Sequence, residues 1–166
     1  MRPSSGTVNE WIKHVATPLV TQRHAAYQWA VSLPLGALLM PLVGFPANSR
    51  GGFHVYGPST TGKSKMLDLA CSVLGDEPKT WETTSSKLEI VASEYNNRLL
   101  CLDEIGQAKK SEVVESAYKL AQGVGKSRTN QNLENIEPFT FELTFLSTGE
   151  SSYADVVRKE TGEEPA

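Results

Sequence analysis

The chain has 166 residues, of which 39% are hydrophobic and 21% are charged, and its formal net charge is −3. This length and composition predict one soluble globular domain with its own hydrophobic core, and exclude a disordered chain. The bulk charge gives no support for nucleic-acid binding, so such a role has to rest on a local patch. Cys71 and Cys101 lie in apolar stretches without a preceding secretory signal, which predicts buried, reduced thiols in a cytoplasmic protein.

The amino-terminal third divides into a polar segment, residues 1–20, and a helical lead-in with a loop, residues 21–52. Residues 1–10 are expected to be loose. Residues 27–42 are predicted to form a helix that is apolar on most faces and kinked at Pro34. The apolar run 30–45 is too short and too interrupted by proline to cross a bilayer, so we expect no membrane association.

A predicted short strand, 53–56, runs directly into a glycine-rich loop. The loop fits G-x-x-x-x-G-K-[ST] at every constrained position, with the residues Gly57, Pro58, Ser59, Thr60, Thr61, Gly62, Lys63 and Ser64. The glycines let successive main-chain N–H groups point at phosphate oxygens, and a helix starting near Gly62 adds its dipole. Lys63 can reach the β- and γ-phosphates, and the Ser64 hydroxyl can occupy one Mg²⁺ position. We therefore predict a site for ATP with Mg²⁺.

Strands and helices are predicted to alternate after this loop. A helix over 63–74 ends at Gly75, and an edge strand follows at 79–82. Ser85 or Ser86 is expected to cap a helix that ends at Tyr95. The remaining predicted elements are a buried strand at 99–102, a helix at 111–121 capped by Ser111, a polar loop at 123–135 and a strand at 139–146. This alternation predicts an α/β fold with a mainly parallel sheet.

Asp103 and Glu104 directly follow the apolar strand at 99–102. A carboxylate at the carboxyl end of such a strand is placed to hold Mg²⁺, which is the predicted role of Asp103. Glu104 can orient and deprotonate a water in line with the γ-phosphate, which favours hydrolysis over phosphoryl transfer to a metabolite. The alternative is that both residues only begin a solvated loop.

Hydroxyl side chains end the last predicted strand. Thr148 is the first choice, and Ser147 the second, for a catalytic polar group that touches the γ-phosphate or the attacking water. For this role, the strand has to lie beside the strand that precedes the glycine-rich loop. The alternative is that these hydroxyls cap a helix that begins before Tyr153.

The order of these motifs resembles that of P-loop ATPases with an additional catalytic glutamate, which include the AAA+ proteins, the superfamily-3 helicases and the RecA-like motors. More narrowly, the chain is similar to the family known as domain of unknown function 927. The similarity rests on residues 51–57, 99–107, 123–128 and 145–150 and extends over about residues 20–155. That family occurs in primase–helicase-like proteins of phages and integrated mobile elements.

The resemblance implies a P-loop NTPase fold of three α/β/α layers, with residues 53–166 as the ATPase core. It implies the motor of a DNA helicase or translocase that works as a homo-oligomeric ring on single-stranded DNA. Such cores continue with a fifth strand and lid elements, so we expect this core to be truncated after its last predicted strand, which carries Ser147 and Thr148 at its end. Helicase activity of this chain alone is therefore not implied.

Three weaker expectations remain. Lys126 and Arg128 lie in a glycine-flanked loop of the kind that lines the pore of ring helicases, so they are candidates for DNA contact, with a solvated loop as the alternative. Arg98, Arg128 and Arg158 are candidates for an arginine supplied to a neighbouring subunit. The alternative functions are a P-loop kinase and a nucleotide-binding interaction module without turnover.

Overall fold

A parallel sheet of four strands forms the centre of the computed structural model, which describes residues 6–45, 50–81, 84–125, 128–129, 135–136 and 138–161. The strands are β1 (Gly52–Tyr56), β2 (Lys79–Thr80), β3 (Leu99–Asp103) and β6 (Thr144–Gly149), in the order β1-β6-β3-β2. β6 is the last strand in sequence, yet it lies between β1 and β3. The carboxyl ends of β1, β6 and β3 therefore meet at one edge of the sheet.

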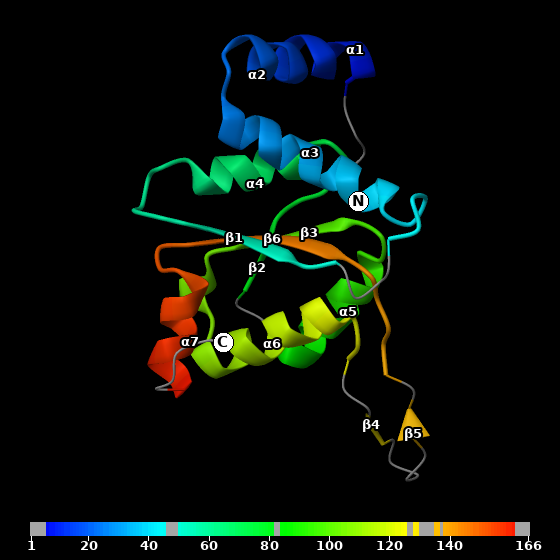
Figure 1. Cartoon of the computed structure of the whole chain (residues 1–166), viewed down its shortest axis with the longest axis vertical. Coiled ribbons are helices and arrows are strands. Elements are labelled where there is room, and N and C mark those ends of the chain that lie inside the picture. The colour runs from blue at the N-terminus through cyan, green and yellow to red at the C-terminus, as the bar shows by residue number, and fades with distance from the viewer. Residues whose placement is uncertain are drawn as a thin grey trace.

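Helices cover both faces of this sheet (Figure 1). The helices α3 (Ala25–Leu39) and α4 (Lys63–Ser72) lie on one face. On the other face lie α5 (Ser85–Glu94), α6 (Lys110–Gln122) and α7 (Tyr153–Thr161). A short 3-10 helix, η3 (Ile105–Gln107), joins β3 to α6. The prediction of a three-layer α/β/α fold with a parallel sheet is confirmed.

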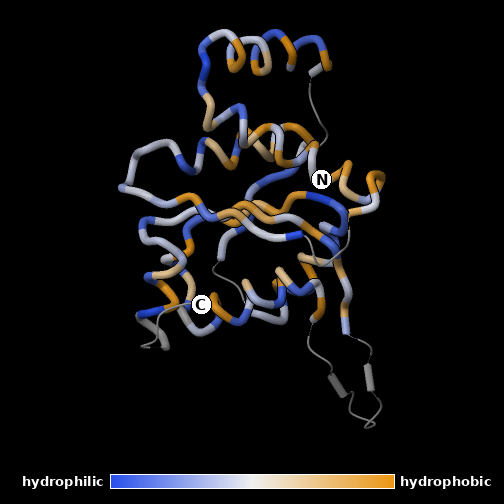
Figure 2. Tube along the Cα trace, viewed as in Figure 1, coloured by the Kyte–Doolittle hydropathy of each residue, from blue (hydrophilic) through white to orange (hydrophobic). Residues whose placement is uncertain are grey.

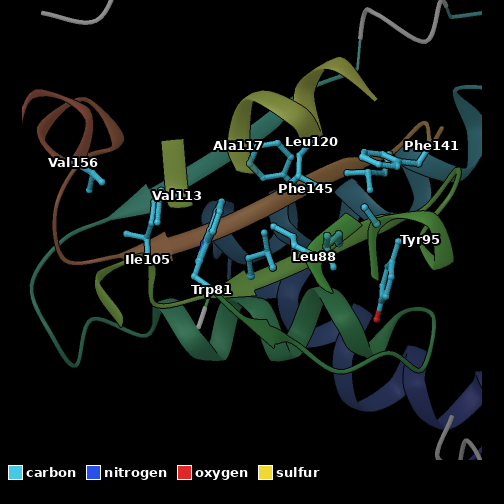
Figure 3. Packing of buried hydrophobic residues seen from close by; sticks show 14 residues of the cluster. Trp81, Leu88, Tyr95, Ile105, Val113, Ala117, Leu120, Phe141, Phe145 and Val156 are labelled. Atoms are coloured by element: carbon cyan, nitrogen blue, oxygen red, sulfur yellow. The ribbon is translucent and has the colours of Figure 1, made fainter. Parts of the chain in front are cut away.

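The core consists of two apolar layers, because the central strands are buried on both faces. The first four residues of β3 and all six of β6 are buried. Trp81, Leu100 and Phe145 belong to the layer between the sheet and α5, α6 and α7 (Figure 3). Leu67 and Leu146 belong to the layer under α3 and α4. Figure 2 shows apolar residues concentrated along these central strands.

The amino-terminal segment is helical where the sequence predicts a loose segment. The helix α1 (Val8–Trp11) begins after Thr7, which forms a capping box with Glu10. A π-helical segment (Ile12–Ala16) and α2 (Thr17–Thr21) continue it. The sequence carries the signal for this helix, which the prediction overlooked, because apolar residues recur at i, i+3, i+4, i+7 and i+8 from Val8. The helix α3 begins and ends earlier than the predicted helix at 27–42. Pro34 lies inside it and is buried.

Two predicted segments are wrong. The strand predicted at 139–146 is β6 and runs from Thr144 to Gly149, whereas residues before it pair antiparallel through the bridge between Val124 and Thr140. The predicted loop 123–135 contains the short strand β4 (Arg128–Thr129) and the first residue of its antiparallel partner β5 (Asn135–Ile136). A two-residue strand cannot show an alternation of apolar and polar residues.

The predicted helix caps are also displaced. Thr84 caps α5 by accepting from the N–H of Lys87, in place of Ser85 or Ser86. The helix α6 begins at Lys110, so Ser111 lies inside its first turn and is not the cap. Cap positions depend on where the preceding loop enters the helix, and neighbouring hydroxyl residues look equivalent in sequence.

Two other sequence expectations concern the thiols and the membrane. Cys71 and Cys101 are buried and carry no disulfide, as predicted. A hydrogen bond with Cys71, together with burial, raises the pKa of the Cys101 thiol. Within the described ranges, no helix combines the length and the apolar character needed to cross a membrane.

Candidate functional site

The glycine-rich loop joins the end of β1 to the start of α4. Gly62 caps α4 with φ 89° and ψ 10°, a left-handed conformation that glycine adopts without steric cost. A Cβ at this position would also lie 2.6 Å from the Tyr27 hydroxyl of α3. At the other end of the loop, the N–H of Gly57 donates to the carbonyl of Gly149, 3.2 Å away, at the end of β6. The loop is thus fixed between two strand ends and the first turn of α3.

The Lys63 ammonium lies against this loop. Its Nζ donates to the carbonyl oxygens of Gly57 and Pro58, both at 2.8 Å. An ammonium bonds more strongly to a phosphate oxygen than to a neutral carbonyl, because the phosphate is charged. The loop carbonyls therefore hold Lys63 where an incoming phosphate can take their place.

Three side chains from three elements converge beside Lys63. The Ser64 hydroxyl of α4 donates to Oδ1 of Asp103 at 3.3 Å, although 39 residues separate the two. The Thr148 hydroxyl of β6 donates to the same Asp103 oxygen at 2.5 Å. Asp103 ends β3 and is half-buried. The strand order explains the convergence, because β6 and β3 are paired and β1, which leads to Ser64, lies on the other side of β6.

Thr148 also accepts a hydrogen bond from the main-chain N–H of Glu104, at 3.2 Å. Thr148 is only 1% exposed, whereas Asp103, to which it donates, is half-buried. Ser147 faces the opposite side of the sheet, where Trp81 Nε1 donates to its hydroxyl at 2.8 Å and His54 Nδ1 lies 3.1 Å away. The alternation of side chains along β6 thus brings Thr148, and not Ser147, to Asp103. Sequence reasoning missed the contacts of Trp81 and His54, for which the sequence gives no local signal.

Glu104 has an unusual backbone conformation, with φ 51° and ψ 79°. For a residue with a Cβ, such a conformation costs about 1–3 kcal/mol. Its carboxylate caps η3 by accepting from the N–H of Gly106 at 3.2 Å. Beside it lies a cavity of about 180 Å³ that Glu150 and Val156 also line.

Ser64 and Asp103 fit a magnesium ion by their chemistry. Mg²⁺ takes oxygen ligands, usually one or two from the protein, and completes its shell with water and phosphate oxygens. In the part of the chain that the structure describes, no three His, Cys, Asp or Glu side chains group together, so no metal site built from protein ligands alone is found there. One hydroxyl and one carboxylate beside the glycine-rich loop match this pattern.

The remaining candidates lie elsewhere. Lys126 falls outside the described residues, and Arg128 is described only as part of β4. Arg98 forms an ion pair with Asp76 at 2.6 Å and precedes the first residue of β3, so it lies at the end of that strand away from Asp103. Arg158 is exposed on α7.

Comparisons with known proteins agree with this architecture. The family model described as "Domain of unknown function (DUF927)" matches residues 1–135. Comparison with curated proteins gives no significant match. Among solved structures, the chain is similar to one described as "SCCmec type IV Cch - active helicase", with 20% identity and a TM-score of 0.66. This similarity, which supports the fold, covers 94% of the present chain and 32% of the helicase chain, so the present chain spans about a third of that protein.

A second solved structure is NtrX from Brucella abortus in complex with ADP. It shares 15% identity, with 96% of this chain and 40% of that chain covered, and the TM-score is 0.39.

Proposed function

The chain belongs to the family described as a domain of unknown function, DUF927, and on that premise we propose that it binds ATP with Mg²⁺ and hydrolyses it. The observation that carries the proposal is the contact between Ser64 and Asp103 beside the glycine-rich loop. The contact joins the start of the helix after the loop to the end of β3, a parallel strand that β6 separates from β1. Ligands of open α/β sheets bind at this edge.

In this proposal, the loop amides and Lys63 bind the β- and γ-phosphates. The cation–carbonyl contacts of Lys63 are exchanged for stronger contacts with phosphate oxygens. Ser64 and Asp103 would hold Mg²⁺, which neutralises charge that develops on the phosphate oxygens. The chain supplies few metal ligands, so the ion and the nucleotide are expected to bind together.

Glu104 is the proposed general base for the attacking water. One oxygen of its carboxylate, Oε1, accepts from the N–H of Gly106, and the other oxygen can accept the proton of that water. Thr148 is proposed as a positioning residue, because one hydroxyl holds the Asp103 carboxylate and the Glu104 backbone together. A direct contact between Thr148 and the γ-phosphate remains the alternative role for this side chain.

We further propose that the chain is the motor core of a DNA helicase or translocase of a phage or mobile element, which assembles as a homo-oligomeric ring. Membership of the family and the similar fold of a solved helicase support this proposal. Lys126 and Arg128 are the proposed contacts to single-stranded DNA. If they bind phosphates, the double alanine variant will show a shallower salt dependence of DNA binding, and an unchanged slope would exclude them.

Phosphate release with and without single-stranded DNA tests the function. Lys63→Ala should abolish ATP binding, whereas Glu104→Gln should keep binding and lose hydrolysis. Lys65→Ala, an exposed lysine on the same helix, is the matched control and should behave as the wild type. DNA-stimulated release supports the motor, and transfer only to an acceptor supports a kinase. ATP binding without turnover supports an interaction module.

A further inference from the structure

A small cavity lies between the amino-terminal helices and α4. Its volume is about 140 Å³. Pro18 and Leu19 of α2 and Leu69 of α4 form apolar walls. His14 of the π-helical segment and Gln22 and His24, from the turn before α3, form the polar part of the lining, or polar rim. The side-chain amide of Gln28 donates to the carbonyl of Leu19 at 2.6 Å, which fixes α2 against α3. The cavity is therefore bounded by elements that are tied together.

Two elements of the cavity lining lead to the glycine-rich loop. Leu69 follows Lys63 by six residues on α4, which places it about 9 Å along the helix axis from the loop. The His24 ring packs edge-on against Tyr27, with 6.0 Å between ring centroids, and the Tyr27 hydroxyl lies against Gly62. Figure 1 shows α3 and α4 starting on the same side of the molecule, beside the loop that follows β1.

We propose that this cavity binds the adenine base of the nucleotide whose phosphates the glycine-rich loop holds. This inference rests on the proposed function. Pockets for whole ligands of drug size enclose roughly 300–1,000 Å³, so a cavity of this size suits one planar ring system and not a complete nucleotide. The ring can lie between apolar walls, with its polar edge at the rim.

The polar rim matches the hydrogen-bonding edge of adenine. A carboxamide offers one acceptor and two donors, and glutamine can pair with the amino group and a ring nitrogen of adenine through two hydrogen bonds. Gln22 Oε1 lies 3.1 Å from His24 Nε2, so the two side chains orient each other. The imidazole also presents a flat face on which a base can stack. Gln22 is therefore the residue that selects adenine.

The test compares ATP with inorganic tripolyphosphate, which has the phosphates but no base. Calorimetric titration of the full chain in Mg²⁺ should give tighter binding of ATP than of tripolyphosphate. In Gln22→Ala, the Kd for ATP should rise about tenfold, since a bidentate base contact is lost, and in His24→Ala it should also rise, since the stacking face and the contact that orients Gln22 are lost. The Kd for tripolyphosphate should stay unchanged in both variants. Gln122→Ala, an exposed glutamine on α6, is the matched control and should change neither.

Each outcome separates this inference from the proposed function. Equal affinity of the wild type for ATP and tripolyphosphate overturns the base site and leaves the phosphate loop intact. The base site is also overturned if both variants keep the wild-type Kd for ATP, or if they lose affinity for the two ligands equally. A wild-type chain that binds neither ligand refutes the proposed function itself. Filling the cavity by Leu69→Phe gives a second test, and it should weaken ATP binding while sparing tripolyphosphate.

Discussion

Replacing Thr148 by valine tests whether one hydroxyl couples the two acidic residues. The hydroxyl donates to Asp103 at 2.5 Å and accepts from the N–H of Glu104 at 3.2 Å. Valine keeps the branched shape of threonine and removes both hydrogen bonds. Because the side chain is buried, water cannot readily replace the lost contact on the Glu104 backbone.

The size of the effect follows from these two bonds. A hydrogen bond to a charged group contributes about 1.5–3 kcal/mol, and one between neutral groups about 0.5–1.5 kcal/mol. Asp103 is half-buried, so solvent can restore part of the first contribution. We therefore expect Thr148→Val to lower the free energy of unfolding by about 2 kcal/mol. The turnover rate should fall by about a hundredfold, because catalytic groups displaced by about 1 Å lose activity on this scale.

Urea unfolding followed by tryptophan fluorescence measures the first effect, and single-turnover ATP hydrolysis measures the second. The Kd for ATP should change little, since Thr148 does not belong to the phosphate loop. Thr148→Ser keeps the hydroxyl and should retain most of the hydrolysis rate. Ser147→Ala removes the neighbouring hydroxyl on the opposite face of the sheet and should lower stability without slowing hydrolysis. Wild-type hydrolysis by Thr148→Val, or equal losses in the valine and serine variants, would refute the positioning role.

Three further predictions use other parts of the structure. Gly52→Ala should lower the free energy of unfolding by about 2–3 kcal/mol in urea, because its Cβ would lie 2.0 Å from an aromatic ring; Gly51→Ala, with open space around it, should be neutral. Lys119→Met should lower the free energy of unfolding by about 3–5 kcal/mol in the same assay, because it removes the 2.7 Å ion pair of the buried Glu89 carboxylate. A loss below about 1 kcal/mol would contradict this. Ser64→Ala should remove the gain in ATP affinity that Mg²⁺ gives, measured by titration with Mg²⁺ and with EDTA; an undiminished gain would show that Ser64 is not a magnesium ligand.

The fold class could be predicted because its signals are local. The eight residues of the glycine-rich loop are consecutive, and the strand before them and the helix after them form from neighbouring residues. The strand β3 could also be predicted from local residues, since a short, continuous apolar run is typical of a parallel strand that is buried on both faces. Strands and helices that alternate along a chain leave few arrangements other than a layered α/β fold.

Two other elements were placed wrongly for different reasons. The helical segment from Val8 to Thr21 could have been predicted, since Thr7 and Glu10 form a capping box and apolar residues follow Val8 at helical spacing. The start of β6 was displaced by five residues, because Phe139 and Phe141 extend the apolar pattern of the strand although they pair antiparallel with residues 123–125. Before β6, partners distant in sequence therefore decide the local structure.

The sequence by itself determined the chemistry of the loop, because the positions of Gly62, Lys63 and Ser64 follow from consecutive backbone geometry. Only the tertiary structure decided which acidic and hydroxyl side chains meet them. By inserting β6 between β1 and β3, the sheet brings Asp103 within 3.3 Å of Ser64, and the pleat of β6 turns Thr148 toward Asp103 and Ser147 away from it. Strand order and register are set by packing over the whole core, so no local pattern could have specified them.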